Sequence, residues 1–295
     1  LILAIGAGIL ASGAINWATV WLYLFSPPVL AGLMVTLELS VLSMAIGNVL
    51  GVASALMVRS RIWSVAWLGR AYIWFFRGTP VLVQLIFWFN LSLMFPQLGF
   101  GGWTVPTNDV ITPFVAALLG LGVNEGAYMS EIFRSGIDSV DKGQTEAGLA
   151  SGMTPGQVMR RIILPQALLV ITPPTGNQTI GMLKTTSLVT AVPFTLELYT
   201  RTRDIAAVTY KPVPLLIVAS IWYLVVTSIL MVGQYYLERH FARGVSARPD
   251  TPKVSLETGT IGVAGSRAGR GGSARSAEGP GAEPPGAPEA GGDGR

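Results

Sequence analysis

Long apolar stretches separated by short polar segments run through the first four fifths of the chain. A helix needs about 20 mainly apolar residues to cross a hydrocarbon core about 30 Å thick. Five stretches are long enough, at residues 29–58, 71–95, 113–133, 166–192 and 213–237. They are apolar all round and do not alternate with a period of two, which favours helices over the strands of a membrane barrel. The pattern therefore predicts an all-α membrane protein with five core transmembrane helices.

The two ends of the chain differ from this core. Residues 1–27 are apolar up to a Pro-Pro pair and predict an additional N-terminal transmembrane helix. They lack the basic start and cleavage pattern of a signal peptide, and a first residue Leu1 leaves open that this end is truncated. Residues 244–295 are rich in Gly, Pro, Ala and Ser, with six basic and six acidic residues. Such a segment buries too little apolar surface to fold, so it is predicted to be a disordered cytoplasmic tail.

Positive charges cluster in alternate loops, which sets the expected orientation. The loops that are rich in Lys and Arg face the cytoplasm in most membrane proteins. These residues are Arg59, Arg61, Arg70, Arg134, Lys142, Arg160, Arg161, Arg239 and Arg243. The loop over 138–165 and the C-terminus are therefore expected to be cytoplasmic, and the loops 96–112 and 193–212 to face outward. Arg77 lies inside a predicted span, where it either snorkels or marks an irregular helix near Gly78 and Pro80.

Composition narrows the classes of function. Only 12% of the residues are charged and 51% are hydrophobic, against about 25% charged in soluble domains. The absence of cysteine excludes disulfides and thiolate metal sites, and the single histidine excludes a His-rich metal site. The net charge of +4 belongs to residues 1–243 and comes mostly from the predicted cytoplasmic loops, so it is no evidence for nucleic-acid binding.

The cytoplasmic loop 138–165 has more local order than a simple connection needs. Asp141 is a candidate N-cap for a first helix, and Gly152 suits the left-handed position at its end. Thr154-Pro155-Gly156-Gln157 then has the pattern of a capping box that starts a second helix, which Pro165 is expected to end. Two readings follow: an amphipathic helix that lies among the lipid headgroups, or a docking element for a soluble partner.

A resemblance favours the second reading. The order Glu146-Ala147-Gly148, then Gly152, then Pro165 resembles the EAA motif of binding-protein-dependent ABC transporter permeases. The motif has Ala where this chain has Gly148, which lowers helix propensity by about 1 kcal/mol. Further segments resemble the polar amino acid and opine permeases within this family, namely "FFRGTPVLVQL", "GAYMSEIFRSGIDSV", "GQTEAG", "LPQA" and "PPTGNQTIGMLKTTSL".

The resemblance covers roughly residues 28–243 and implies a fold, a function and partners. It implies the type I ABC importer permease fold and a multi-pass subunit of the bacterial cell (inner) membrane. It implies a second permease subunit, identical or homologous, and an extracytoplasmic protein that delivers a polar amino acid. The EAA loop, with Glu146, Ala147, Gly148, Gly152 and Pro165, would dock on a cytoplasmic ABC ATPase. This chain has no phosphate-binding G-x-x-x-x-G-K-[ST] loop, so ATP and magnesium would bind to that partner and no cofactor to this chain.

Polar residues inside the spans are candidates for the translocation path, because burying them in lipid is costly. Those singled out are Glu125, Asn177, Gln178 and Lys184. The last three follow Pro173-Pro174, which can break a helix and expose backbone carbonyls. Lys184 has two readings: it snorkels or pairs with an acidic residue such as Glu125, or it lines an outward-facing cavity and attracts a carboxylate. For Glu131, an ion pair with Arg134 is expected at a spacing of three residues.

Two other classes of protein compete with the permease. A secondary amino acid transporter would work without an ATPase and usually shows internal repeats, which the sequence does not reveal convincingly. An intramembrane enzyme would need a catalytic arrangement such as a Ser/His pair, HExxH or an aspartyl pair, and no residues are placed for one. The sequence therefore predicts no catalytic residues and a transport function.

Overall fold

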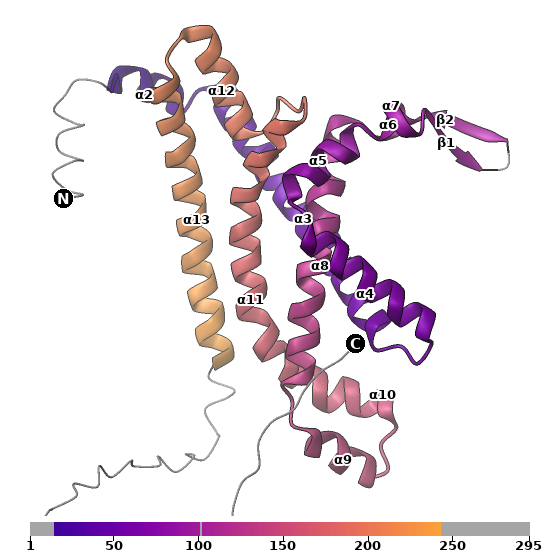
Figure 1. Cartoon of the computed structure of the whole chain (residues 1–295). Helices are drawn as coiled ribbons and strands as arrows, with labels where there is room; N and C mark the ends of the chain where they lie inside the picture. Colours follow the sequence, from indigo (N-terminus) through magenta and orange to yellow (C-terminus); the bar gives the residue numbers. More distant parts are fainter. Residues whose placement is uncertain (1–14, 101, 243–295) are drawn as a thin grey trace, which may run out of the picture. The chain divides into compact units, whose positions relative to one another are not determined.

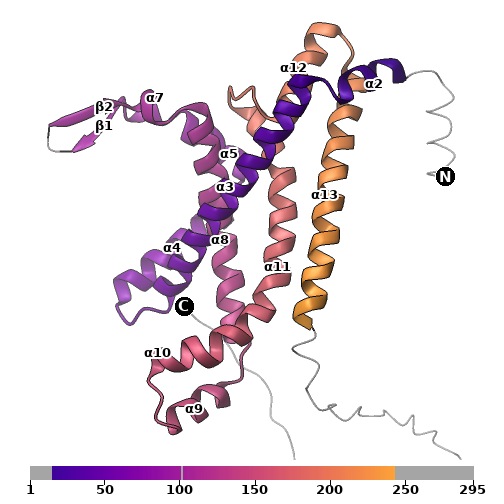
Figure 2. The ribbon, with the colours of Figure 1, turned by 180° about the vertical axis from the view of Figure 1, so that it is seen from behind.

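The chain is described by a computed structural model over residues 15–100 and 102–242, most of which is helical (Figures 1 and 2). Residues 1–14, most of the predicted N-terminal helix, and the predicted tail 244–295 lie outside the described residues. In chain order the elements are α2 (Trp17–Leu24), α3 (Pro27–Val58), α4 (Trp63–Gly78), α5 (Val81–Phe89), α6 (Leu91–Met94), β1 (Gln97–Phe100), β2 (Trp103–Pro106), α7 (Thr107–Val110), α8 (Pro113–Asp138), α9 (Lys142–Ala150), α10 (Pro155–Val158), the π-helical turn η1 (Met159–Ile163), α11 (Leu164–Thr185), the 3-10 turn η2 (Thr186–Ala191), α12 (Leu198–Thr209) and α13 (Pro212–Ala242).

Each predicted core span falls on helix, but the helices differ in how apolar they are. Among the described residues, α3 and α13 are long and apolar enough to cross a membrane, and α4 with α5 would make a third, bent span. The helices α8 and α11 have 26 and 22 residues but are less apolar. Their polar residues include Asn124, Glu125, Gln178 and Lys184. The first three of these line a cavity between the two helices.

The predicted span 71–95 is wrong as a single straight helix. Helix α4 begins already at Trp63 and ends at Gly78, and α5 starts at Val81 after a bend of 103°. Thr79 is extended, with φ −113° and ψ 143°, because the ring of the following Pro80 disfavours the helical conformation before it. The irregular helix expected near Gly78 and Pro80 is confirmed.

Two predicted helix breaks at proline are also wrong. The chain stays helical from α10 through η1 into α11, where Pro165 lies in the first turn of α11. The wide π-helical turn directly before it, closed by the Leu164 N–H to the Met159 carbonyl, accommodates a residue that lacks an N–H group. Pro173 and Pro174 lie inside α11 without a break, in a stretch that packs closely against α8 and α13.

Glycines let α8 pack closely against its neighbours. Gly47 and Gly51 of α3 lie against Glu125 and Met129 of α8, where an added Cβ would come within 2.7 Å of the Glu125 Cγ and 2.6 Å of the Met129 Cβ. In return, a Cβ on Gly122 would lie 2.9 Å from the Ile46 side chain of α3. Small residues that allow backbones to approach are a main means of packing helices within lipid. This crossing sets the position of α8, which carries the polar residues of the site.

At the other end of α3, a buried carboxylate joins three helices. The side chain of Glu197 caps α12 by accepting from the N–H groups of Tyr199 at 2.8 Å and Thr200 at 3.2 Å. It also accepts from the hydroxyl of Thr36 on α3, at 2.9 Å, and from that of Tyr223 on α13. The sequence predicted only an outward-facing loop at 193–212, and within it the structure buries the Glu197 side chain completely.

The glycine crossing predicts opposite effects for two Gly→Ala substitutions. Gly51→Ala should destabilise the chain by about 1–3 kcal/mol, because the new methyl overlaps Met129. The matched control is Gly233→Ala on α13, where no atom lies within 4 Å of the added Cβ and helix propensity improves. Thermal unfolding in nanodiscs should show a lower Tm for Gly51→Ala and an unchanged or higher Tm for Gly233→Ala. An unchanged Tm for both would contradict close packing at this crossing.

Candidate functional site

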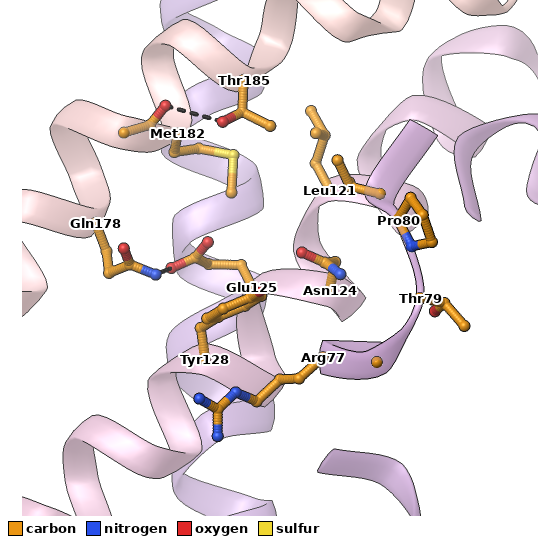
Figure 3. A pocket seen from close by; sticks show the side chains of 13 residues that line it. Arg77, Thr79, Pro80, Leu121, Asn124, Glu125, Tyr128, Gln178, Met182 and Thr185 are labelled. Carbon is orange, nitrogen blue, oxygen red and sulfur yellow. Dashed lines mark hydrogen bonds between the residues drawn. The ribbon is translucent and has the colours of Figure 1, made fainter. Parts of the chain in front are cut away.

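A cavity of about 490 Å³ lies at the bend between α4 and α5 and is also lined by residues of α8 and α11 (Figure 3). The region of the bend contributes residues 77–81, and α8 and α11 contribute further polar side chains. The lining residues are Arg77, Gly78, Thr79, Pro80, Val81, Leu121, Asn124, Glu125, Tyr128, Gln178, Gly181, Met182 and Thr185. The cavity therefore forms where the two less apolar helices meet the only sharply bent helix pair among the described residues.

Two buried amides hold the bend in place. The Gln84 Nε2 donates to the carbonyls of Phe76 and Thr79, both at 3.1 Å, and to the Thr79 hydroxyl at 2.7 Å. The Asn124 Nδ2 of α8 donates to the same Phe76 carbonyl at 2.8 Å. A helix that ends inside a membrane leaves carbonyls without partners, and neighbouring side chains must satisfy them. These contacts fix the residues from Arg77 to Pro80 against the cavity.

Glu125 is the acidic side chain of the cavity. It is buried, with 6% of its surface exposed, and its Oε1 accepts from the Gln178 Nε2 of α11 at 3.1 Å (Figure 3). The glycine crossing with Gly47 supports the Cβ and Cγ of Glu125 from behind. The structure thus brings together two of the four residues singled out for the translocation path.

Arg77 is the cationic side chain of the cavity. Its guanidinium lies 5.4 Å from the ring centre of Tyr128, a distance typical of a cation–π contact, and 3.8 Å from the Glu131 Oε1. Among the lining residues, Arg77 is the basic and Glu125 the acidic side chain. A cavity with one basic and one acidic group, together with amide and hydroxyl groups, suits a small solute that carries both charges.

A row of ion pairs leads from the cavity along α8. Glu131 contacts Arg77 at 3.8 Å and Arg134 at 2.7 Å, which confirms the expected pair at a spacing of three residues. Arg134 in turn lies 3.8 Å from Asp138, and Asp138 pairs with Arg59 of α3 at 2.5 Å. The charges alternate in sign and end beside α9, where Arg59 and Asp138 line a hollow with Lys142. The cavity and the 138–165 loop are therefore physically connected.

Asn177 and Lys184 lie outside this cavity. Asn177 is exposed, and Lys184 lines a separate hollow between α11 and α13 with Ser187, Ser220, Tyr223, Leu224 and Thr227. No ion pair between Lys184 and Glu125 is present among the described residues. A pair with Glu125 is therefore not formed, while snorkelling of Lys184 and its place in an outward-facing cavity both stay predictions.

The 138–165 loop has the capped structure that its sequence predicts. Asp141 caps α9 by accepting from the Gly143 N–H at 2.7 Å, and Thr154 with Gln157 forms the capping box of α10. Between them, Gly152 has φ +79°. The N–H groups of Gly152 and Met153 donate to the carbonyls of Leu149 and Gly148, at 3.0 and 3.1 Å, which is the pattern of a Schellman motif.

The residues of the predicted docking motif have different surroundings. Glu146 and Ala147 are exposed on α9. Gly148 is buried, and a Cβ there would come within 2.8 Å of Val158 and 3.1 Å of Ile162. The glycine at this position thus allows α9 to lie close to the helix that follows, which compensates for its low helix propensity. Gly152 is needed for its backbone conformation, since no atom lies within 4 Å of an added Cβ.

Sequence reasoning missed part of the cavity. It noticed Arg77 as a charge inside a span but did not place it in the site, and it did not consider Asn124 or Tyr128. The available signal was the run Arg77-Gly78-Thr79-Pro80, because a charge next to a helix-breaking Gly and Pro within a span indicates an irregular helix beside a cavity. Nothing in the spacing of Asn124 and Tyr128 identified their partners on α4.

Comparisons with known proteins agree with this architecture. A family model described as "binding-protein-dependent transport system inner membrane component" matches residues 47–243. The chain is 50% identical over 235 residues to the arginine transport system permease protein of Corynebacterium glutamicum, over 78% of this chain and 73% of the relative. It is 35% identical over 223 residues to the L-cystine transport system permease protein of Bacillus subtilis, over 75% and 90% of the two chains.

A solved structure is similar in the same region. It is described as an amino acid ABC transporter with histidines, and it matches with a TM-score of 0.64 and 35% identity. The match covers 73% of this chain and 95% of the solved one. The type I ABC importer permease fold expected from the sequence is thereby confirmed.

The positive φ of Gly152 predicts that an alanine there weakens the loop. A left-handed conformation costs a residue with a Cβ about 1 kcal/mol, equivalent to roughly fivefold more frequent local opening. Hydrogen exchange of the full chain in nanodiscs should therefore show roughly fivefold faster exchange at the amides of residues 152 and 153 in Gly152→Ala. Gly156→Ala is the control, because Gly156 lies in α10 with no atom near an added Cβ. Equal exchange in the two variants would show that the positive φ does not limit this loop.

Proposed function

The chain belongs to the binding-protein-dependent transport system inner membrane components, and from this premise we propose that it is the permease subunit of an ATP-driven importer of polar amino acids. The single observation that carries the substrate class is the cavity with Arg77 on one side and Glu125 with Gln178 on the other. The names of the relatives point to the same class, since they include permeases for arginine and L-cystine.

An amino acid fits the chemistry of this cavity. Its carboxylate would bind the Arg77 guanidinium, which can donate two parallel hydrogen bonds to a carboxylate. Its ammonium group would bind Glu125, whose position is fixed by Gln178 and Gly47. The amide of Asn124 is already engaged by the bend, so Tyr128 and Thr185 remain to meet the substrate side chain. This set of partners is suited to a polar side chain.

The 138–165 loop would be the contact to a cytoplasmic ABC ATPase, which would bind ATP and magnesium while this chain binds no cofactor. Support comes from the exposed Glu146 and Ala147 on a short helix whose end is fixed by Gly152. The ion pairs between Arg77, Glu131, Arg134, Asp138 and Arg59 provide a physical connection from this contact to the cavity. A substrate carboxylate that binds Arg77 would compete with Glu131 and so disturb this row of charges.

Orientation and further partners follow from the distribution of charge. The loop with α9 and α10 and the C-terminal end of α13 lie toward the same end of the helices (Figures 1 and 2), and basic residues gather there. By the positive-inside rule this end, with the C-terminus, would face the cytoplasm. The opposite end would receive the amino acid from an extracytoplasmic binding protein. A second permease subunit, identical or homologous, would complete the membrane part of the importer.

The alternative of a secondary amino acid transporter has no support in the family to which the chain belongs. That family is described by its dependence on a binding protein. A secondary transporter would also leave the exposed, doubly capped α9–α10 loop without a partner.

The substrate site is tested by uptake in proteoliposomes that also contain the ATPase and the binding protein, with arginine as the first substrate. Glu125→Gln and Arg77→Gln should each weaken uptake at low substrate concentration about tenfold or more, because each removes a charge-assisted hydrogen bond of about 1.5–3 kcal/mol. Lys184→Gln is the control, since Lys184 lines a different hollow. Wild-type uptake in both cavity variants, with loss in Lys184→Gln, would place the path between α11 and α13 instead.

A further inference from the structure

The segment from Leu91 to Val110 leaves the helical packing and exposes apolar side chains. It consists of the short helices α6 and α7 and the antiparallel hairpin β1–β2. The sequence predicted α6 as the end of the span 71–95 and the rest as the loop 96–112. The segment's most exposed large apolar residues are Trp103, with 80% of its surface exposed, and Leu93, with 79%. Met94 and Phe95 are also exposed. Both views show the hairpin extending away from the helices (Figures 1 and 2).

The segment nevertheless has a defined structure at its base. Gln97 is paired with Pro106 and Phe100 with Trp103 across the hairpin. The N–H of the buried Thr107 donates to the Pro96 carbonyl at 3.0 Å, and its hydroxyl donates to the Phe95 carbonyl. These contacts join the start and the end of the hairpin, so its apolar side chains are presented on a fixed support.

Among the described residues, no other element covers this hairpin, although an isolated hairpin usually needs such a packing partner. A single two-stranded hairpin is only marginally stable in water and requires packing against another surface. Three of the four residues of β2 are exposed in the described part of the chain, namely Trp103, Thr104 and Pro106. Another surface must therefore cover it.

Lipid is the surface that its composition fits. No charged residue occurs between Arg77 and Asp109, although surfaces that meet water or a soluble partner normally carry charges. The exposed residues also continue an apolar surface that begins on α5 with Leu82, Val83, Ile86 and Phe87. Trp is enriched where membranes meet water, because its ring has an apolar body and a polar N–H group.

We infer that α6 and the β1–β2 hairpin lie in the boundary between headgroups and acyl chains, on the membrane face opposite the α9–α10 loop. The two faces are separated by α8, whose 26 residues span about 39 Å at 1.5 Å per residue and join the hairpin side to the loop side. Trp103, Leu93 and Met94 insert and hold the end of α5. Because α5 begins directly after the bend at Thr79-Pro80, this anchor also holds the bend that lines the cavity. The inference rests on the membrane location and not on the substrate proposed above.

The absence of cysteine from the chain makes the anchor directly measurable. A single Trp103→Cys, and separately Leu93→Cys, is spin-labelled in the full chain in nanodiscs. Collision of the label with a water-soluble nickel chelate and with oxygen, which concentrates in lipid, reports its surroundings. Val208→Cys is the control, since Val208 is also 80% exposed but lies on α12 among charged residues.

If the hairpin is anchored in lipid, labels at 103 and 93 should collide with the nickel chelate at least threefold less often than the label at 208. They should also collide with oxygen more often than the label at 208. Equal accessibility to the chelate at 103, 93 and 208 would overturn it. Shielding that arises only after the binding protein is added would also overturn it, because the covering surface would then be protein. Uptake measured on the same samples reports separately on the proposed transport function.

Discussion

The close crossing of α3 and α8 is the constraint on which the site depends. Gly47 and Gly51 on one helix, and Gly122 on the other, let the two backbones approach to a distance that side chains would prevent. Association of helices in lipid gains nothing from the exclusion of water, so this fit must supply the stabilisation. It also places Glu125 directly against Gly47. A single close contact thus both packs the central helix and positions the buried carboxylate of the cavity.

The cavity itself exists because one helix is bent next to this crossing. Pro80 interrupts the helix, and the amides of Gln84 and Asn124 satisfy the carbonyls that the bend exposes. Arg77 thereby lines the same cavity as Glu125 and starts a row of ion pairs that reaches the α9–α10 loop. The cavity thus gathers polar groups from α4, α8 and α11, and Glu125 and Asn124 each have a hydrogen-bond partner there. The proposed transport function depends on these polar groups of the cavity.

The sequence predicted the features that depend on local rules. The length of the apolar stretches located the core helices, and the capping box and the left-handed Gly152 follow from residue types at fixed spacing. The features it missed depend on distant contacts. The side of α11 that Lys184 faces and the burial of Glu197 are set by packing between helices, which no local pattern encodes. The effect of proline depends on packing in the same way. Pro165 and Pro173, which were expected to end or break a helix, lie in a continuous one, whereas Pro80 bends the chain between α4 and α5.

The most direct test of this account is a high-resolution structure of the complete importer trapped with its amino acid. The account predicts density for the amino acid in the cavity between α4, α8 and α11, with its carboxylate toward Arg77 and its ammonium group toward Glu125. Density in the hollow beside Lys184 and α13, with the cavity unoccupied, would contradict it.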